Sequence, residues 1–252
     1  MSSAKILELT FRVLLTTVLI FTWIGQSIAQ EDGTGSLLEF KYGIHFPFAD
    51  MKDRFGVNST LGAGFERFVG NKIFAGIDGS FYFGSRVNED VLEGLRSFDG
   101  SIIGISGFPG NVGLKERGYY IGLNTGKIFG KAESLTGIRF QIGAGFLQHK
   151  IRVQVNQGTL EVLEGDKVKG YDRLTNGPAI HLAIGYQYQN PKNNLHFNIM
   201  GDLFTAFTKS RRSFDNLTGG YLIGNRTDIL AGISLAYIVS ISRDQEADQI
   251  YY

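Results

Sequence analysis

Apolar and polar residues alternate with a period of two along most of this chain, and this period constrains the fold more than any other feature. In 38–48 the even positions hold Leu, Phe, Tyr, Ile, Phe and Phe, whereas residues such as Glu39 and Lys41 occupy the odd positions. Neighbouring side chains of a β-strand point to opposite sides of the sheet. The alternation therefore predicts strands with one apolar face and one polar face.

The same period predicts eight strands. They are expected at about 38–48, 57–68, 73–83, 118–128, 138–146, 180–188, 195–207 and 229–241. The fifth strand can continue to Val155 through a register break near Gln148. The connections alternate in length: 84–117, 156–177 and 208–226 are long, whereas 69–72, 129–136 and 189–193 are short. Short turns at one end and longer loops at the other are typical of a barrel that crosses a membrane.

The second face of these strands consists of Gly and of small or polar residues with few large apolar groups, which suits the narrow interior of an eight-stranded barrel. The apolar face would then contact lipid, with aromatic rims around an aliphatic band. The inner rim, at the short turns, is expected to hold Phe40, Phe65, Phe68, Phe74, Phe129, Phe140, Tyr186, Tyr188, Phe197 and Tyr237, and the outer rim Phe46, Phe48, Phe81, Phe83, Tyr119, Phe146 and Phe207. We predict an all-β fold, an eight-stranded antiparallel transmembrane up-and-down β-barrel. An exported soluble β-barrel is the alternative.

The composition narrows the classes of function. The chain has 25 Lys and Arg against 24 Asp and Glu, and a net charge of +1 gives no electrostatic basis for nucleic-acid binding. The absence of Cys excludes disulfides, thiolate metal sites and cysteine nucleophiles. The 34 Gly and 20 Phe, with only 4 Pro, favour many closely paired strands.

The N-terminus has the layout of a secretory signal peptide. Lys5 and Arg12 precede the uncharged run 13–24, and small residues lead to Ala29. As a helix this run would span only about 18 Å, which is short of a hydrocarbon core of about 30 Å. We predict a signal peptide at 1–29 that is cleaved near Ala29 and Gln30, a barrel at 30–241 and a periplasmic C-terminal tail at 242–252. The protein is therefore expected in the outer membrane.

The inward faces carry ionisable residues, which are Glu39, Lys41, His45, Glu66, Asp78, Arg139, His181, His196, Asp202 and Asp228. Enclosed charges must pair or stay hydrated, so we predict a polar network that fills the lumen. A proton or ion path is the alternative. His181 and His196 lie on strands joined by a short turn, and with Asp202 they suggest a metal or acid–base site, but no ligand spacing supports it. We assign no catalytic residue, cofactor site or metal site.

The eight strands, the signal peptide and the loop rhythm resemble the small outer-membrane barrels of the OmpA/OmpX type over about 36–241. The Gly-rich, aromatic-rich strands and the Ile-Ala-Gln cleavage region resemble small outer-membrane barrels common in Bacteroidota. Residues 232–237, Gly-Ile-Ser-Leu-Ala-Tyr, are similar to the C-terminal strand signal of outer-membrane proteins, although Leu230 stands where a polar residue is usual. The resemblance implies a barrel fold, and some members of the wider group serve type IX secretion or gliding.

The long loops indicate how such a barrel would act. We expect loop 84–117 to contact an envelope partner protein. Loop 208–226 holds Lys209, Arg211, Arg212 and Arg226, for which we expect ionic contacts with outer-membrane lipid, namely the phosphates of lipopolysaccharide. We predict a structural or protein-interaction role in the cell envelope, without enzyme activity, a cofactor or a nucleic-acid partner.

Three alternatives remain open. The first is an accessory component of a secretion or gliding (type IX) machinery, and the second is a narrow channel. The third is an outer-membrane lipid A-modifying enzyme, because such barrels combine His with Ser and an acid at the outer rim. The candidates for that chemistry are His45 and His149, with Ser85 or Ser210 as the nucleophile.

Overall fold

The computed structural model describes most of the chain between Gly35 and Ile241. The described residues are 35–104, 107–130, 134–158, 160–190, 195–217, 219–220 and 224–241. The predicted signal peptide at 1–29 and the predicted tail at 242–252 lie outside these residues.

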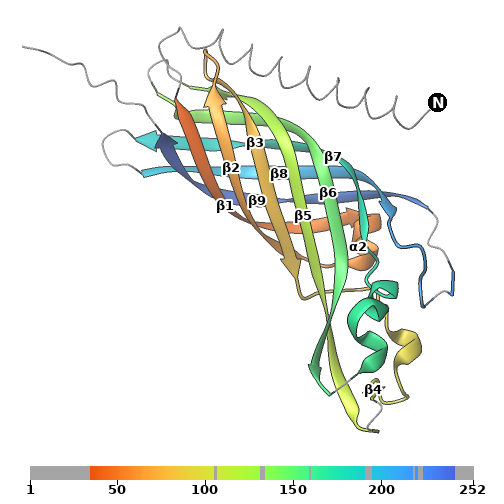
Figure 1. Cartoon of the computed structure of the whole chain (residues 1–252). Helices are drawn as coiled ribbons and strands as arrows, with labels where there is room; N and C mark the ends of the chain where they lie inside the picture. Colours follow the sequence, from red (N-terminus) through yellow and green to blue (C-terminus); the bar gives the residue numbers. More distant parts are fainter. Residues whose placement is uncertain are drawn as a thin grey trace, which may run out of the picture.

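The described residues form a closed antiparallel barrel of eight long strands, which confirms the predicted fold class (Figure 1). The strands are β1 (Ser36–Ala49), β2 (Asn58–Phe68), β3 (Ile73–Gly84), β5 (Pro109–Phe129), β6 (Gly137–Gln157), β7 (Thr175–Asn190), β8 (Leu195–Ser210) and β9 (Asn225–Ile241). Each barrel strand pairs with the barrel strands before and after it, and β1 pairs with β9. The short β4 (Ile102–Ile103) follows β3 in the chain but pairs only with the start of β5, so β3 and β5 pair directly. No edge of the barrel is left open, because every barrel strand has two partners.

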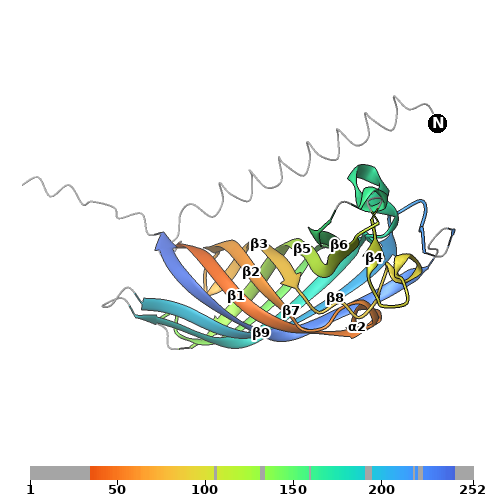
Figure 2. The ribbon, with the colours of Figure 1, turned by 90° about the horizontal axis from the view of Figure 1, so that it is seen from below.

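Four short helical segments lie at one end of the barrel, with β4. They are α2 (Asp50–Arg54), η1 (Glu93–Leu95), η2 (Glu161–Leu163) and η3 (Gly165–Gly170). Figures 1 and 2 show all of them at the end opposite the short turns, where β5 and β6 project beyond the other strands. We call this the outer end. No helix among the described residues is long and apolar enough to cross a membrane.

The strand β5 is longer than the sequence predicts. It begins at Pro109 instead of about Gly118, so that the last quarter of the expected loop 84–117 belongs to the strand and is paired with β6 from Asn111 onward. The expected continuation of the fifth strand is confirmed, because β6 runs to Gln157. The register shift, however, lies between Asn111 and Val112 on the opposite strand and not near Gln148. Glycines such as Gly113 interrupt the alternation in 109–117, and the strand there is held by pairing with β6.

Apolar side chains cover the outside of the barrel. Ile77, Leu123 and Ile184 in the middle of their strands are each more than half exposed, and most of the predicted rim aromatics are exposed as well. Lipid is the solvent that such a band of apolar side chains requires. Two rim predictions are wrong: Phe68 and Phe74 point inward and are buried, because each lies on the inward parity of its strand.

Large apolar side chains also lie in the interior, where the sequence predicts few of them. At the inner end, Phe68 and Phe74 pack with Leu37, Ile128 and Ile238. The outer half holds a larger apolar cluster that joins Tyr82, Tyr120, Phe204, Leu147 and Leu230 to residues of the outer segments. Glycines make room where strands approach closely, as at Gly185, where an added Cβ would overlap the carbonyl oxygen of Ile199.

Candidate functional site

The inner half of the lumen is organised around Arg139 of β6, whose guanidinium is fully buried. It forms ion pairs with Glu39 of β1, at 2.8 Å, and with Glu66 of β2. It also donates a hydrogen bond of 2.7 Å to the side chain of Gln187 and stacks over the ring of Phe74 at 4.2 Å. One cation thus compensates two buried carboxylates across the barrel, as burial of charge requires.

A second polar layer lies nearer the middle. The Lys41 ammonium donates to Asp78 at 2.7 Å, and the His181 Nε2 lies 2.9 Å from Asp202. Asp202 also lies 3.8 Å from the Nε2 atom of His45. These groups face inward from four strands, with Lys41 and His45 both on β1, so the layer connects β1, β3, β7 and β8.

Aromatic side chains close the lumen above this layer. Phe204 stacks on the His181 ring, with the ring centroids 4.0 Å apart and an interplanar angle of 2°. Tyr120 and Tyr82 contact Phe204 edge-on at 5.1 and 5.9 Å. The two polar layers are therefore enclosed between apolar clusters at both ends.

The sequence-derived alternatives for site chemistry find no matching geometry. His181 is paired in register with Phe204 but His196 with Gln189, near the inner end, so these two histidines are not brought together. Within the described parts of the chain no group of three or more His, Cys, Asp or Glu is arranged to hold a metal ion. His45 does not lie at the rim. It lies inside the barrel, and the hydroxyl of Thr60 contacts its Nδ1 at 2.8 Å there.

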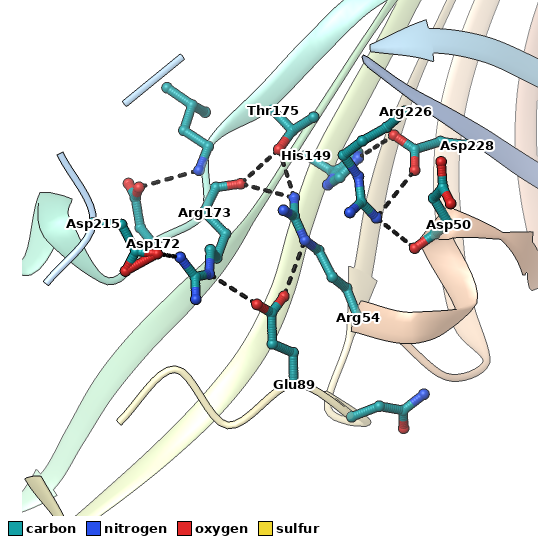
Figure 3. Close-up of polar contacts among 12 residues, drawn as sticks. Asp50, Arg54, Glu89, His149, Asp172, Arg173, Thr175, Asp215, Arg226 and Asp228 are labelled. Atoms are coloured by element: carbon teal, nitrogen blue, oxygen red, sulfur yellow. Dashed lines mark hydrogen bonds and ion pairs between the residues drawn. The ribbon is translucent and has the colours of Figure 1, made fainter. Parts of the chain in front are cut away.

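The other rim candidate, His149, is also buried. Its Nε2 lies 2.8 Å from Asp228, and the hydroxyl of Thr208 donates to the same carboxylate at 2.5 Å. The neighbouring Arg226 lies 3.5 Å from Asp228 and donates to the carbonyl oxygen of Asp50 (Figure 3). This group ties β6, β8 and β9 to α2 and includes neither of the candidate serines.

A second ionic group at the outer end is centred on Glu89, which follows β3. Glu89 accepts a hydrogen bond of 3.0 Å from Arg54 of α2 and one of 2.8 Å from Arg173, which precedes β7. Arg173 also forms an ion pair with Asp215, which follows β8 (Figure 3). Burial lowers the pKa of Arg54 to about 10, and the nearby Arg226 adds to this effect. Residues from four separate segments are thus joined by one chain of charges.

Apolar packing reinforces these contacts. Val91, Leu92 and Ile102 from the segment after β3 are buried with Phe55 and Tyr171 in the outer apolar cluster. We use the name outer cap for α2 together with the described residues of 85–108, 158–174 and 211–220. The buried side chains of the outer cap pack onto the barrel mouth, and the segments of the outer cap also contact one another.

The four cations predicted to contact lipopolysaccharide have different surroundings. Arg226 lies in the mouth beside Asp228, and Arg212 forms a bidentate contact with Asp172 at 2.7 and 2.5 Å. Arg211 and Arg212 line a cleft of about 420 Å³, together with residues of η3. Lys209 is exposed, on the outward parity of β8.

Sequence reasoning missed the ionic group around Glu89. Its members lie in segments without periodicity, so the pattern that located the lumen residues could not find them. The available signal was the position of charged residues. Glu89, Arg173 and Asp215 all lie in predicted loops at the same end of the barrel. Such residues converge only if the loops fold over the mouth.

No protein-family model and no curated protein matches the chain. Solved structures with a similar fold include Neisserial surface protein A, with 10% identity and a TM-score of 0.42, covering 82% of this chain and 99% of that one. The attachment invasion locus protein Ail of Yersinia pestis has 11% identity and a TM-score of 0.39, covering 83% and 100%. The outer membrane protein OprG from Pseudomonas aeruginosa has 10% identity and a TM-score of 0.41, covering 83% and 98%.

The chain is a small eight-stranded transmembrane β-barrel. That assignment is based on its own strand pairing and its outward apolar band. The likeness to the solved barrels concerns the fold alone.

Proposed function

We propose that the protein is an integral outer-membrane barrel that acts in the cell envelope by presenting its outer cap to a partner protein. The observation that carries this proposal is a set of apolar side chains on the cap segment after β3. Phe98 and Phe108 are 109% and 75% exposed, and Ile103 between them is 59% exposed. Apolar groups exposed in this way beyond the membrane rims are a feature of interaction sites.

The setting of these residues supports the proposal. Glu89 and the buried Leu92 and Ile102 anchor the same segment to the barrel mouth, whereas Phe98, Ile103 and Phe108 remain outside the packed cluster. A surface held in place before binding loses less conformational entropy when a partner docks. The segment therefore combines a fixed base with an apolar tip.

The filled lumen argues against the narrow channel that the sequence leaves open. Phe204, Tyr82 and Tyr120 occupy the barrel above the middle polar layer. An ion crossing here would have to displace packed aromatic rings. We expect no single-channel conductance from the purified barrel in planar lipid bilayers, and stable conductance steps would favour the channel.

A site-specific photo-crosslinker tests the interaction. It would be placed at Phe108 in the organism that produces the protein, with Ile77 in the lipid-facing band as the matched control position. We expect a discrete crosslinked protein from Phe108 but not from Ile77. The Phe98→Ser/Ile103→Ser double substitution should abolish that product while the barrel still folds.

The point substitutions are preferable to deletion of the whole segment, because deletion would also remove the buried Leu92 and Ile102. Folding is checked by the shift in gel mobility between unheated and heated samples. Crosslinking that is equal at both positions, or that is unchanged in the double variant, would contradict the proposal. The identity of the partner would show whether it belongs to a secretion or gliding machinery.

A further inference from the structure

Four cations lie side by side on the outward face of the projecting β5–β6 ribbon. Lys115 is paired in register with Arg152, and Arg117 with Lys150. Their positions have the same parity as the lipid-facing Tyr119 and Phe146, so their side chains leave the barrel on its outer surface. Glu116, between Lys115 and Arg117, points inward and is buried. We call Lys115, Arg117, Lys150 and Arg152 the ribbon patch.

The charges of the ribbon patch have no carboxylate partner among the described residues of the outer surface, although Arg117 donates a hydrogen bond of 2.6 Å to the backbone carbonyl oxygen of Glu116 and its charge acts on the buried Glu116 carboxylate. Like charges directly opposite each other on paired strands repel and destabilise the pair. Among the described residues none of the four forms an ion pair with an Asp or Glu, and no outward position of β5 to β8 is acidic. Other cations at this end, such as Arg54, Arg173 and Arg212, do have carboxylate partners. The ribbon patch therefore has the charge pattern of a site for an external anion.

The height of the patch indicates which anion it meets. Arg117 is paired in register with the rim residue Phe83 of β3, and along β5 it lies two residues, about 7 Å of strand, beyond the rim residue Tyr119. The headgroup region extends about 5–7 Å beyond the hydrocarbon core on each side of a bilayer. Lipid phosphates lie at that level, in the leaflet that surrounds the outer rim.

The patch continues toward β8. Gln148, paired with Tyr119, accepts a hydrogen bond of 3.1 Å from Asn176, which in turn accepts one from Arg211. Lys209 is paired with Asn176 in register. Of the four cations that the sequence assigns to lipopolysaccharide contact, Lys209 and Arg211 thus extend the ribbon patch along the outer surface. Arg212 and Arg226 lie at the barrel mouth.

We propose that the ribbon patch binds the phosphate groups of phosphorylated glycolipid in the outer leaflet, the chemistry of lipid A. Two arginines offer planar forks that bind phosphate oxygens in pairs, and two lysines add point charges. The cross-strand spacing of about 5 Å allows one phosphate to contact cations of both strands. The cleft beside η3 is a weaker candidate, because Lys169 and Arg212 there are paired with Asp166 and Asp172.

Native mass spectrometry of the full barrel tests this proposal. The protein would be released from nanodiscs of phosphatidylcholine that contain either bisphosphorylated lipid A or its enzymatically dephosphorylated form. We expect the native chain to retain the bisphosphorylated lipid and not the dephosphorylated one. The Lys115→Gln/Arg117→Gln/Lys150→Gln/Arg152→Gln variant should bind it at least about tenfold more weakly, because several charge-assisted contacts are lost.

A matched control removes the same charge elsewhere on the surface, away from both the ribbon patch and the cleft. It carries Lys52→Gln, Arg67→Gln, Arg86→Gln and Lys127→Gln, and its retention should stay within about twofold of native if the site is local. Arg117→Lys/Arg152→Lys keeps all charges and should give an intermediate loss, because only the forks disappear. This conservative pair keeps the test valid even if the fourfold variant folds poorly.

Three results would overturn the proposal. Equal losses in the fourfold variant and the matched control would mean that only total charge matters. Retention of the dephosphorylated lipid as strong as that of lipid A would remove the role of phosphate. Binding of free pyrophosphate in detergent as tight as that of lipid A would assign the site to a soluble ligand instead of the membrane.

Discussion

Replacement of Arg139 by Met is the sharpest test of the interior. Among the residues that the structure describes, Arg139 is the one cation that forms an ion pair with the buried carboxylates of Glu39 and Glu66, which are 3% and 0% exposed. Removing one partner from a buried ion pair costs about 3–5 kcal/mol, because the remaining charge is left in a medium of low dielectric constant. The amide oxygen of Gln187 also loses its donor, at roughly 1 kcal/mol. We therefore expect Arg139→Met to lower the free energy of unfolding by about 4–6 kcal/mol.

The measurement is a urea titration of the barrel refolded into phosphatidylcholine vesicles. Gel mobility without heating reports the folded fraction, since the single Trp of the chain, Trp23, lies in the predicted signal peptide. Arg67→Met removes a cation from the exposed face of β2 and should change the free energy of unfolding by less than about 0.5 kcal/mol.

A compensating variant separates loss of charge balance from loss of packing. Arg139→Met with Glu39→Gln and Glu66→Gln leaves no unpaired buried charge, so most of the lost stability should return. The reasoning would be refuted if Arg139→Met cost less than about 1 kcal/mol, or if the compensating variant were no more stable than the single one.

Three further predictions concern the lumen and the outer cap. Phe204→Ala should lower the free energy of unfolding by about 3–5 kcal/mol in the same titration, whereas Phe207→Ala, on the lipid face, should cost clearly less; equal losses would contradict the packing described for the lumen. Glu89→Gln should accelerate limited proteolysis of the outer cap without changing the gel mobility of the barrel, because Arg54 and Arg173 lose their common carboxylate; an unchanged cleavage rate would count against this link. The hydrogen bond from the Ser97 hydroxyl lowers the pKa of Asp99 to about 2. The turn that carries Phe98 should therefore keep its full stability above a pH of about 4 and lose it as the pH falls to about 2, which an NMR titration of Asp99 would follow. A titration midpoint near pH of about 4 would disprove the contact.

The barrel itself was predictable because a strand encodes its two faces locally. Ile77 and Leu123 could be placed on the lipid side, and Asp78 and Arg139 on the inward parity, from alternation alone. The same rule failed at β5, because Gly110 and Gly113 weaken the pattern and only pairing with β6 extends the strand to Pro109. Phe68 and Phe74 are placed wrongly if their aromatic rings alone are used to predict a rim position, because both lie on the inward parity of their strands.

The contacts between side chains of different strands could not be predicted. The two-residue period shows which face of its strand a residue occupies, but it does not show the height of that residue relative to the other strands. Register decides that His181 lies beside Asp202 and far from His196. It also decides that Lys115 and Arg117 lie opposite Arg152 and Lys150, a pattern that the sequence shows only as two unrelated basic stretches.

By itself, the sequence determined the number of barrel strands, the side of the barrel on which most strand residues lie and the end that carries the long loops. These properties follow from local geometry, in which successive side chains alternate and each turn reverses the chain. The tertiary structure decided which charges meet, how the lumen is filled and how the loops combine into the outer cap. Those outcomes depend on strand register, on barrel closure and on packing between segments far apart in the chain, and no local pattern records them.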